Sequence, residues 1–457
     1  MIKKKNLFNA LILFLGLHLI IWTLVPTFSN TNLPLDTIEA LAWGSNIEWG
    51  FNKHPPLSAF VVEIFYKIFG NNDWAYYFLS QLFVVTSFFL VWKFSEEFFE
   101  EKMHSLFSVL LLEGIYFYNF TTPEFNVNVC QLPFWAGTAY FFWKAINDNK
   151  NINWILFGLF AGFGFLSKYL FVYLLAALAI FFLFKVFKQK KFNTKCFISL
   201  AVFILVISPH LLWLSENNYS TVLYGIKRTG LENINYLKHF TNPFIFLLKQ
   251  IGILVPTALM TLAIISKFNL SANLKDKKLQ FLIFSTFLPI LLLFITSIIT
   301  GAKIRTMWLT PFYLFLGTFL IYFFKNKIRL KNVKKFLILF SVFFVLSPAT
   351  YLYISITQTT KRTDYPGREI AYLVQSKWNN NFSNEIEIVV GDEWFGGNLS
   401  YHLASRPKWY NTLNQNILNK KIKGGFVYVG NPTILKKVCP GVFGTIKPVG
   451  ICMIGSK

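Results

Sequence analysis

Long apolar segments separated by short polar loops make up about the first 355 residues of the chain. A helix needs about 20 apolar residues to cross a hydrocarbon core of about 30 Å. Eleven segments come near this length, so the pattern predicts a polytopic α-helical membrane protein. The predicted spans are residues 7–27, 74–94, 104–121, 126–146, 152–167, 169–187, 196–214, 244–266, 279–300, 306–324 and 336–355.

Composition and charge agree with this class and exclude others. Hydrophobic residues make up 54% of the chain and charged residues only 14%, unlike a soluble globular domain. The formal net charge of +23 raises nucleic acid as a partner, but the positive charge clusters between apolar segments, as is typical of cytoplasmic loops. We therefore expect membrane lipids, and no nucleic acid, as partners. The clusters are Lys3 to Lys5; Lys185, Lys188, Lys190, Lys191 and Lys195; Lys267, Lys275, Lys277 and Lys278; and Lys325, Lys327, Arg329, Lys331, Lys334 and Lys335.

The basic clusters also predict a topology. With the N-terminus in the cytoplasm, alternation of the spans places all of these clusters on the cytoplasmic side. An odd number of spans then puts the first loop (about 28–73), the loop near 215–243 and the C-terminus on the outer side. The first apolar segment is too long for a cleavable signal peptide, so we interpret it as a retained helix.

From about residue 356 the composition becomes that of a soluble domain. Alternating helices and strands predict a small α/β domain over residues 356–457, outside the cytoplasm, after a transmembrane domain over residues 1–355. The predicted elements are a helix from Pro366 to Lys377, a strand over 385–390, a helix from Gly396 to Ala404, a strand over 425–430, a helix from Pro432 to Val438 and a closing hairpin.

Two cysteines fall in this predicted domain. Cys439 and Cys452 flank a turn rich in proline and glycine. Outside the cytoplasm they could form a disulfide, and two free thiols are the alternative.

The first outer loop carries the most informative group of polar residues, in PLDTIEALAWGSNIEWGFNKHPPL (34–57). Asp36 and Glu39 are three residues apart, which places them on one face of a helix. Such a pair can supply a general base with a second acid that assists it or binds a metal. The alternative is an amphipathic helix at the membrane surface, with its acids toward water.

The stretch 34–57 also contains, near its end, a Lys-His pair followed by two prolines. Pro55 and Pro56 end one segment and begin the next helix, which fixes the direction of Lys53 and His54. Lys53 could hold a phosphate as a point charge, and His54 could donate a hydrogen bond or bind a metal. The alternative is a helix boundary with cations at the membrane interface.

Three further basic residues lie on the predicted outer side, against the usual charge bias. Lys168, Lys303 and Arg305 together suggest a pocket for an anionic headgroup, and snorkelling of single side chains is the alternative. Glu216 and Asn217, after the seventh predicted span, could contact sugar hydroxyls, and an ordinary polar loop is the alternative.

The sequence has no glycine-rich nucleotide loop, no HExxH and no clustered Cys/His ligands. An enzyme on the outer face has no supply of nucleotide sugars, so an activated sugar would have to arrive on a lipid. The rival interpretation is a transporter or flippase, which predicts charged or broken helices near mid-membrane and repeated halves. Charge in an outer loop and an extra domain at one end favour a transferase.

Several motifs in order strengthen this interpretation. They are the acidic first loop, KHPPL (53–57), TTPEFNVNVCQLPFWAGTAYFFWKA (121–145), GLFAGFGFLSKY (158–169), SPHLLWLSENN (208–218), AKIRTMWLTPFYL (302–314) and, more weakly, GDEWFGGNLSYHLASRP (391–407). This succession resembles the protein-mannosyltransferase-like (family 39 type) glycosyltransferases of the GT-C superfamily. It is most similar to the bacterial branch that holds the lipid A aminoarabinose transferase and the galacturonic acid transferases of rhizobial lipopolysaccharide.

The resemblance implies an inverting transfer from a polyprenyl-phosphate-sugar donor to lipid A, lipopolysaccharide or another cell-envelope acceptor. It implies an active site on the periplasmic face of a bacterial cytoplasmic membrane, with a catalytic acid that Asp36 matches. The second acid, often adjacent in the family, is here at Glu39. Some relatives bind a metal through an acid where this chain has Asn52 before Lys53. Metal dependence is therefore not carried over, no cofactor is assigned, and a divalent metal stays open.

Overall fold

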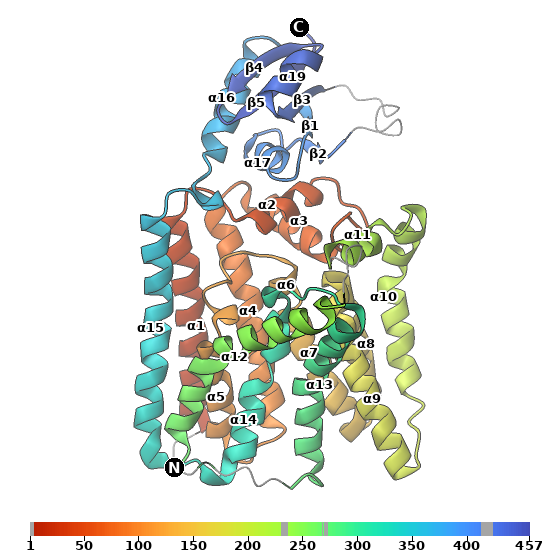
Figure 1. The fold of residues 1–457 in the computed structure, drawn as a ribbon, viewed down its shortest axis with the longest axis vertical. Coiled ribbons are helices and arrows are strands. Elements are labelled where there is room, and N and C mark those ends of the chain that lie inside the picture. The colour runs from red at the N-terminus through yellow and green to blue at the C-terminus, as the bar shows by residue number, and fades with distance from the viewer. Residues whose placement is uncertain (1–3, 230–235, 267, 269–272, 413–423) are drawn as a thin grey trace.

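The computed structural model describes residues 4–229, 236–266, 268, 273–412 and 424–457. It consists of a helical body and a C-terminal α/β domain that sits on one end of this body, while the N-terminus lies at the other end (Figure 1). Each part has its own hydrophobic core. Lys3, Lys267 and part of the predicted loop near 215–243 lie outside the described residues.

The predicted class, a polytopic helical membrane protein with a small α/β domain, is confirmed. Among the described residues, seven helices are long and apolar enough to cross a membrane. They are α1 (Lys4–Ser29), α4 (Asp73–Glu96), α9 (Val172–Gln189) with the preceding 3₁₀ turn η3 (Tyr169–Phe171), α10 (Cys196–Glu216), α12 (Lys238–Ile264), α13 (Lys277–Thr300) and α15 (Val333–Thr357) with the preceding turn η7 (Leu330–Asn332). An eighth is the pair of η5 (Thr306–Tyr313) with α14 (Leu316–Phe324) and η6 (Lys325–Lys327), bent by 51°.

The other three predicted spans are shorter or broken, so the predicted eleven is reached only if these are counted. The third is α5 (Lys102–Leu110) followed by η1 (Leu111–Gly114) and η2 (Tyr116–Tyr118). The fourth is α6 (Val127–Cys130) and α7 (Leu132–Asp148), and the fifth is α8 (Asn151–Ser167).

Buried polar residues account for the break after α5. The Glu113 carboxylate lies 3.1 Å from Nδ1 of His18 on α1. The Asn119 side chain donates to the backbone carbonyl of Glu113 (2.8 Å) and to its carboxylate (3.2 Å). The Asn119 side chain thereby satisfies a backbone carbonyl at the break, which hydrocarbon itself cannot do.

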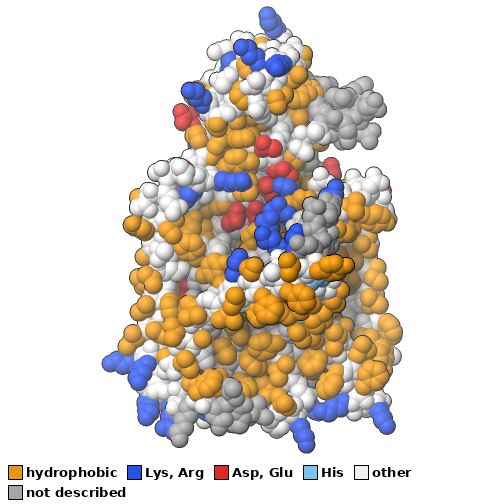
Figure 2. Space-filling model, in the orientation of Figure 1, with side chains coloured by type: hydrophobic (Ala, Val, Ile, Leu, Met, Phe, Trp, Pro, Cys, Tyr) orange, Lys and Arg blue, Asp and Glu red, His pale blue; other side chains and the backbone are white. Residues whose placement is uncertain are grey.

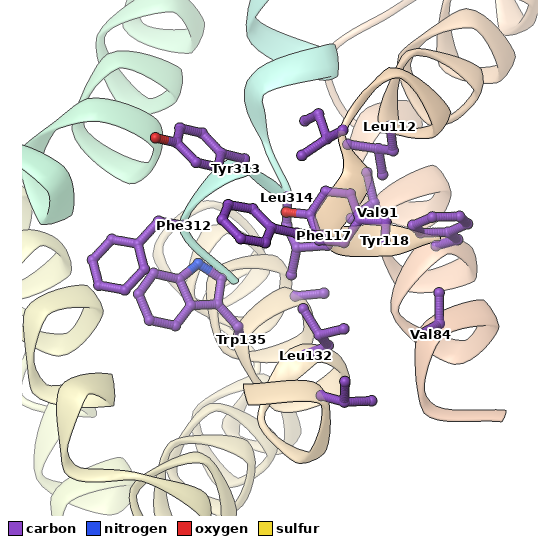
Figure 3. Packing of buried hydrophobic residues seen from close by; sticks show 14 of the residues in the cluster. Val84, Val91, Leu112, Phe117, Tyr118, Leu132, Trp135, Phe312, Tyr313 and Leu314 are labelled. Atoms are coloured by element: carbon purple, nitrogen blue, oxygen red, sulfur yellow. The ribbon is translucent and has the colours of Figure 1, made fainter. Parts of the chain in front are cut away.

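Aromatic side chains enclose these irregular segments inside the body. Figure 3 shows Phe117 and Tyr118 facing Tyr313, Phe312 and Trp135 in one cluster. The rings of Trp135 and Phe312 are 4.6 Å apart between centroids, and those of Phe117 and Tyr313 stack at 6.3 Å. The broken helices therefore face protein rather than lipid, and their loops are held in fixed positions.

The C-terminal domain contains a five-stranded mixed sheet with the order β2-β1-β3-β5-β4. Strand β1 is parallel to β2 and β3, and β5 is antiparallel to β3 and β4. Cys439 and Cys452 form a disulfide in the structure, rather than remaining as two free thiols. The predicted elements are all present, and the short strand β2 is an addition. The elements are α16 (Gly367–Asn379), β1 (Ile386–Val390), α17 (Phe395–His402), β2 (Lys408–Tyr410), β3 (Gly425–Gly430), α19 (Pro432–Val438), β4 (Val442–Ile446) and β5 (Val449–Ile454).

Helix α17 docks this domain onto α2 (Leu35–Gly44), the helix of the first loop. Gly397 makes the close approach possible, because a Cβ there would lie 3.0 Å from Cγ2 of Ile38 and 3.1 Å from Cβ of Ala42. On its other side, the Thr37 hydroxyl donates to the carbonyl of Phe125 in the body. Helix α2 is thus held between the two parts of the molecule.

Ion pairs and hydrogen bonds around α17 add to the docking. Arg406 donates to the carboxylate of Glu63 (2.6 Å) on α3 (Leu57–Phe69) and stacks over the ring of Tyr66 at 4.2 Å. The Tyr401 hydroxyl donates to Asp73 at the start of α4 (2.7 Å). The C-terminal domain is therefore held to the helical body by α3 and α4 as well as by α2.

We predict that Gly397→Val weakens this docking. The added side chain would collide with Ile38 and Ala42, and overpacking of this kind costs about 1–3 kcal/mol. The thermal unfolding midpoint of the purified protein should fall. Gly430→Val is the matched control, because a Cβ at Gly430 meets only Leu435, at 4.0 Å. Equal midpoints for the two variants would contradict the docking described here.

Candidate active site

Asp36 lies in the first turn of α2, where the backbone changes from extended Pro34 to helix. Its backbone N–H donates to a carboxylate oxygen of Glu124 at 2.9 Å. Glu124 belongs to the loop between η2 and α6, so the two acids come from segments 88 residues apart. The structure thus places the Glu124 carboxyl group against the backbone of Asp36, near enough for the charges of the two acids to interact.

Burial changes the protonation of both acids. It raises the pKa of Asp36 above its ordinary value, and the charges of Lys168, Lys53, Arg228 and Arg362 oppose this rise. Burial, and then the negative charge of Asp36, raise the pKa of Glu124 to about 8. The four cations favour the ionised form of Asp36, and the negative charge of Asp36 favours the protonated form of Glu124.

Sequence reasoning did not single out Glu124. The signal was present, because an acid in the short loop between the predicted spans 104–121 and 126–146 must lie on the same outer side as Asp36. Its pairing with Asp36 depends on tertiary structure. In the described part of the chain, no group of three or more His, Cys, Asp and Glu residues could hold a metal ion.

Lys168 is buried between α8 and η3, near enough to Asp36 for their charges to interact. Its Nζ donates to Oδ1 of Asn128 at 2.5 Å and lies 5.3 Å from the ring centroid of Trp308. Burial lowers the pKa of Lys168 to about 7, although the charge of Asp36 acts in the opposite direction. The predicted proximity of Lys168 to Asp36 is present in the structure.

Lys53 links the first loop to the C-terminal domain. Its Nζ lies 2.9 Å from the carboxylate of Glu39 and 3.2 Å from that of Glu393, which precedes α17. Burial raises the pKa of Glu39, and its hydrogen bond from Lys53 opposes the rise. In the structure, Lys53 is paired with these two protein carboxylates. Its contact with a substrate phosphate therefore stays a prediction.

His54 packs its ring edge against Trp43, with the ring centroids 5.9 Å apart. Burial and the nearby charges of Lys168 and Lys53 lower the pKa of His54 to about 3. The imidazole is therefore neutral, and the structure gives it a packing contact with α2.

The two remaining predicted cations, Lys303 and Arg305, follow α13. Lys303 is exposed and Arg305 half-buried, and neither forms an ion pair within the described chain. The backbone N–H of Lys303 donates to the carbonyl of Thr229, just after α11 (Ser220–Arg228). Arg228 and Arg362, which the sequence did not predict, act on Asp36 through their charges. Figure 2 shows basic side chains gathered with acidic ones where the helical body meets the C-terminal domain.

Two cavities lie near α2. One, of about 390 Å³, is lined by Leu35, Glu124, Lys361 and Arg362 among others, near the end of α2 that carries Asp36. The other, of about 400 Å³, is lined by Trp43 near the opposite end of α2, and its walls include the predicted residues Glu216 and Asn217. The structure therefore does not bring Glu216 and Asn217 to the carboxyl pair.

Comparison with known proteins agrees with part of the resemblance. Residues 53–213, about a third of the chain, match the model of the dolichyl-phosphate-mannose-protein mannosyltransferase family. The match includes the Lys-His-Pro-Pro motif, the loop of Glu124 and Lys168. No curated protein matches the chain.

The chain is also similar to solved structures of the oligosaccharyltransferase of Archaeoglobus fulgidus. One is tethered to an acceptor peptide with an NVT sequon; the identity is 11%, the TM-score 0.47, and the similarity covers 89% of this chain and 64% of that one. Another, AglB with an inhibitory peptide and a dolichol-phosphate, has 10% identity and a TM-score of 0.41, over 84% and 63% of the two chains. The chain thus spans somewhat less than two thirds of these proteins.

We predict that Lys168 makes the stability of the protein depend on pH. Its pKa of about 7 in the folded protein lies below the ordinary 10.5, so between these values the unfolded chain binds the additional proton. Stability should therefore rise as the pH rises through this window. Lys168→Met, which removes the charge, should flatten the rise. Unfolding midpoints from about pH 6.5 to 9.5 would measure it.

Lys150→Met is the control for this measurement, because Lys150 is an exposed lysine just before α8. The control should keep the wild-type dependence on pH. An unchanged dependence in Lys168→Met would show that the buried amine does not titrate in this window.

Proposed function

We propose that this protein is a membrane-embedded glycosyltransferase that transfers a sugar from a polyprenyl-phosphate carrier to an acceptor hydroxyl. The observation that carries the proposal is the pair Asp36 and Glu124, set among cations at the end of a multi-pass helical body. A base for the acceptor and positive charge for a phosphate are the two requirements of this reaction. The family match over residues 53–213 supports it, because that family is described by a dolichyl-phosphate-linked donor.

In the proposed reaction, the donor phosphate lies among Lys168, Arg228, Arg305 and Arg362. These charges stabilise the phosphate as its bond to the anomeric carbon breaks. A phosphate would also favour the charged form of Lys168, whose pKa is otherwise lowered to about 7 by burial. The buried lysine would then become fully charged only when the donor is bound.

The acceptor hydroxyl oxygen attacks the anomeric carbon from the face opposite the leaving phosphate, so the configuration inverts. A new carbon–oxygen bond forms, and the hydroxyl proton passes to the carboxylate of Asp36. Burial and the charge of Asp36 raise the pKa of Glu124 to about 8, so a protonated Glu124 adds no second negative charge beside Asp36. Glu39 has a supporting role, because its ion pair with Lys53 ties α2 to Glu393 of the C-terminal domain.

The proposed setting is the outer face of a bacterial cytoplasmic membrane, with lipid A, lipopolysaccharide or another envelope molecule as acceptor. The resemblance of the sequence motifs supports this setting. Two features support the orientation: basic side chains line the end of the body opposite the C-terminal domain (Figure 2), and that domain contains a disulfide. One feature favours the transporter alternative, namely the buried pair of His18 and Glu113 inside the helical body. Neither of the two cavities beside α2 includes these residues in its lining.

We predict that Asp36→Asn lowers sugar transfer by about 10²–10⁴-fold, because the amide cannot accept the proton of the acceptor. The measurement is transfer by purified protein in nanodiscs, with a polyprenyl-phosphate-sugar and envelope lipid extract. Asp148→Asn, at the end of α7, is the matched control and should retain activity. Near-normal transfer by Asp36→Asn would move the chemistry to another residue.

We also predict the orientation of the chain. A reporter that is active only outside the cytoplasm should be active when fused after Lys457 and inactive when fused near Lys191. The lysines over 185–195, with no acid among them, resist translocation, whereas the C-terminal domain has an extracytoplasmic type of cysteine pairing. A C-terminal fusion that reports the cytoplasm would place the C-terminal domain and the Asp36 site inside the cell, and the proposed donor would be on the wrong face.

A further inference from the structure

The cavity of about 400 Å³ near the C-terminal end of α2 differs chemically from the surroundings of Asp36. The first loop, the end of α10 and the C-terminal domain all contribute to its walls. The aromatic side chains include Trp43, Trp213, Trp409 and Tyr410, and the polar ones are mostly amides and carboxylates. Part of this cavity therefore exists only because the C-terminal domain is docked.

The described lining residues of this cavity carry negative charge. Its lining includes Glu48, Glu216 and Glu393, and none of its described lining residues is Lys, Arg or His. Lys53 neutralises Glu393 from outside the lining, whereas Glu48 and Glu216 form no ion pair within the described chain. A phosphate or carboxylate would be repelled here, in contrast to the cation-rich surroundings of Asp36.

The lining also has the groups that bind sugars. The ring of Tyr410, which is half-buried, offers a flat apolar face for the carbon-bound hydrogens of a sugar ring. Amides such as Asn217 both donate and accept hydrogen bonds, and carboxylates such as Glu216 accept them from hydroxyl or ammonium groups. This combination fits an oligosaccharide that is neutral or carries amines.

One face of α2 connects the cavity to the carboxyl pair. Asp36, Glu39 and Trp43 are spaced by three and four residues, so they share this face. Trp43 follows Asp36 by seven positions, which corresponds to a rise of about 10 Å along the helix axis. This is about the length of two sugar units, so a chain bound in the cavity could present a hydroxyl at Asp36.

We propose that this cavity binds the acceptor, and that the acceptor is a neutral or amine-bearing oligosaccharide segment rather than an anionic one. The inference rests on the transferase function proposed above and adds the class of acceptor to it. The C-terminal domain, through Trp409, Tyr410 and Glu393, would then select the acceptor, while the body binds the donor.

Binding of defined tetrasaccharides to the full-length protein in nanodiscs tests this proposal. The probes are tetra-N-acetylglucosamine, which is neutral, tetraglucosamine, which is cationic, and tetragalacturonate, which is anionic. Saturation-transfer NMR and titration should show binding of the neutral or the cationic probe, and binding of the anionic probe at least about tenfold weaker.

Two variants locate the binding. Tyr410→Ala should weaken binding of the probes about tenfold or more, because it removes a half-buried stacking surface from the cavity wall. Glu216→Gln should weaken binding of the cationic probe more than that of the neutral one. The matched controls are Trp74→Ala, at the start of α4, and Glu369→Gln, on the exposed side of α16, and both should bind as the wild type does.

Equal or tighter binding of the anionic probe, no binding of either other probe, or unchanged binding by Tyr410→Ala would each overturn the proposal. Because no donor is present, this result is independent of the transferase activity. A wild-type protein that binds the probes through Tyr410 but transfers no sugar overturns the proposed function and leaves the cavity as a glycan site. One that transfers sugar and binds none of the probes overturns the cavity proposal alone.

Discussion

The packing of α17 against α2 is the contact on which the arrangement at the outer end of the molecule depends. Gly397 lets the two helices approach so closely that a side chain at this position would meet Ile38 and Ala42. Because α2 also contacts the loop of Phe125 and Glu124, it is fixed from both sides. Movement of the C-terminal domain would therefore move Asp36 relative to Glu124 and Lys168. Acceptor-side and donor-side chemistry would be coupled through one ten-residue helix.

The second constraint is the separation of charge along this helix. Cations surround the end with Asp36, whereas the cavity at Trp43 has only acidic charge among its described lining residues. Lys53 lies between the two, paired with Glu39 and Glu393. A substrate with an anionic end and an uncharged or basic end would be oriented by this field before it made any specific contact. Burial strengthens the effect because it reduces screening by water and salt.

Several helices of the body are interrupted by turns and loops. The break near Glu113 is stabilised by His18 and Asn119, and aromatic rings enclose it. The loop that follows carries Glu124, and Asn126 at its end accepts hydrogen bonds from the backbone of α6. The irregular backbone therefore has a function in the proposed mechanism: it brings an acid from a buried loop to the first turn of α2.

The sequence alone determined the class of protein, the position of most spans, and the elements and cysteine pairing candidates of the C-terminal domain. Periodicity, span length and charge bias are local properties, so they can be read along the chain. It also pointed to Asp36, Glu39, Lys53 and Lys168 as candidate site residues, because charged residues in the predicted outer loops are few. Tertiary structure alone decided that Glu124 pairs with Asp36, that Lys53 pairs with Glu39 and Glu393, and that Glu216 lies in a separate cavity. These pairings join segments up to some 340 residues apart, and no local pattern in the sequence records which distant segments pack together.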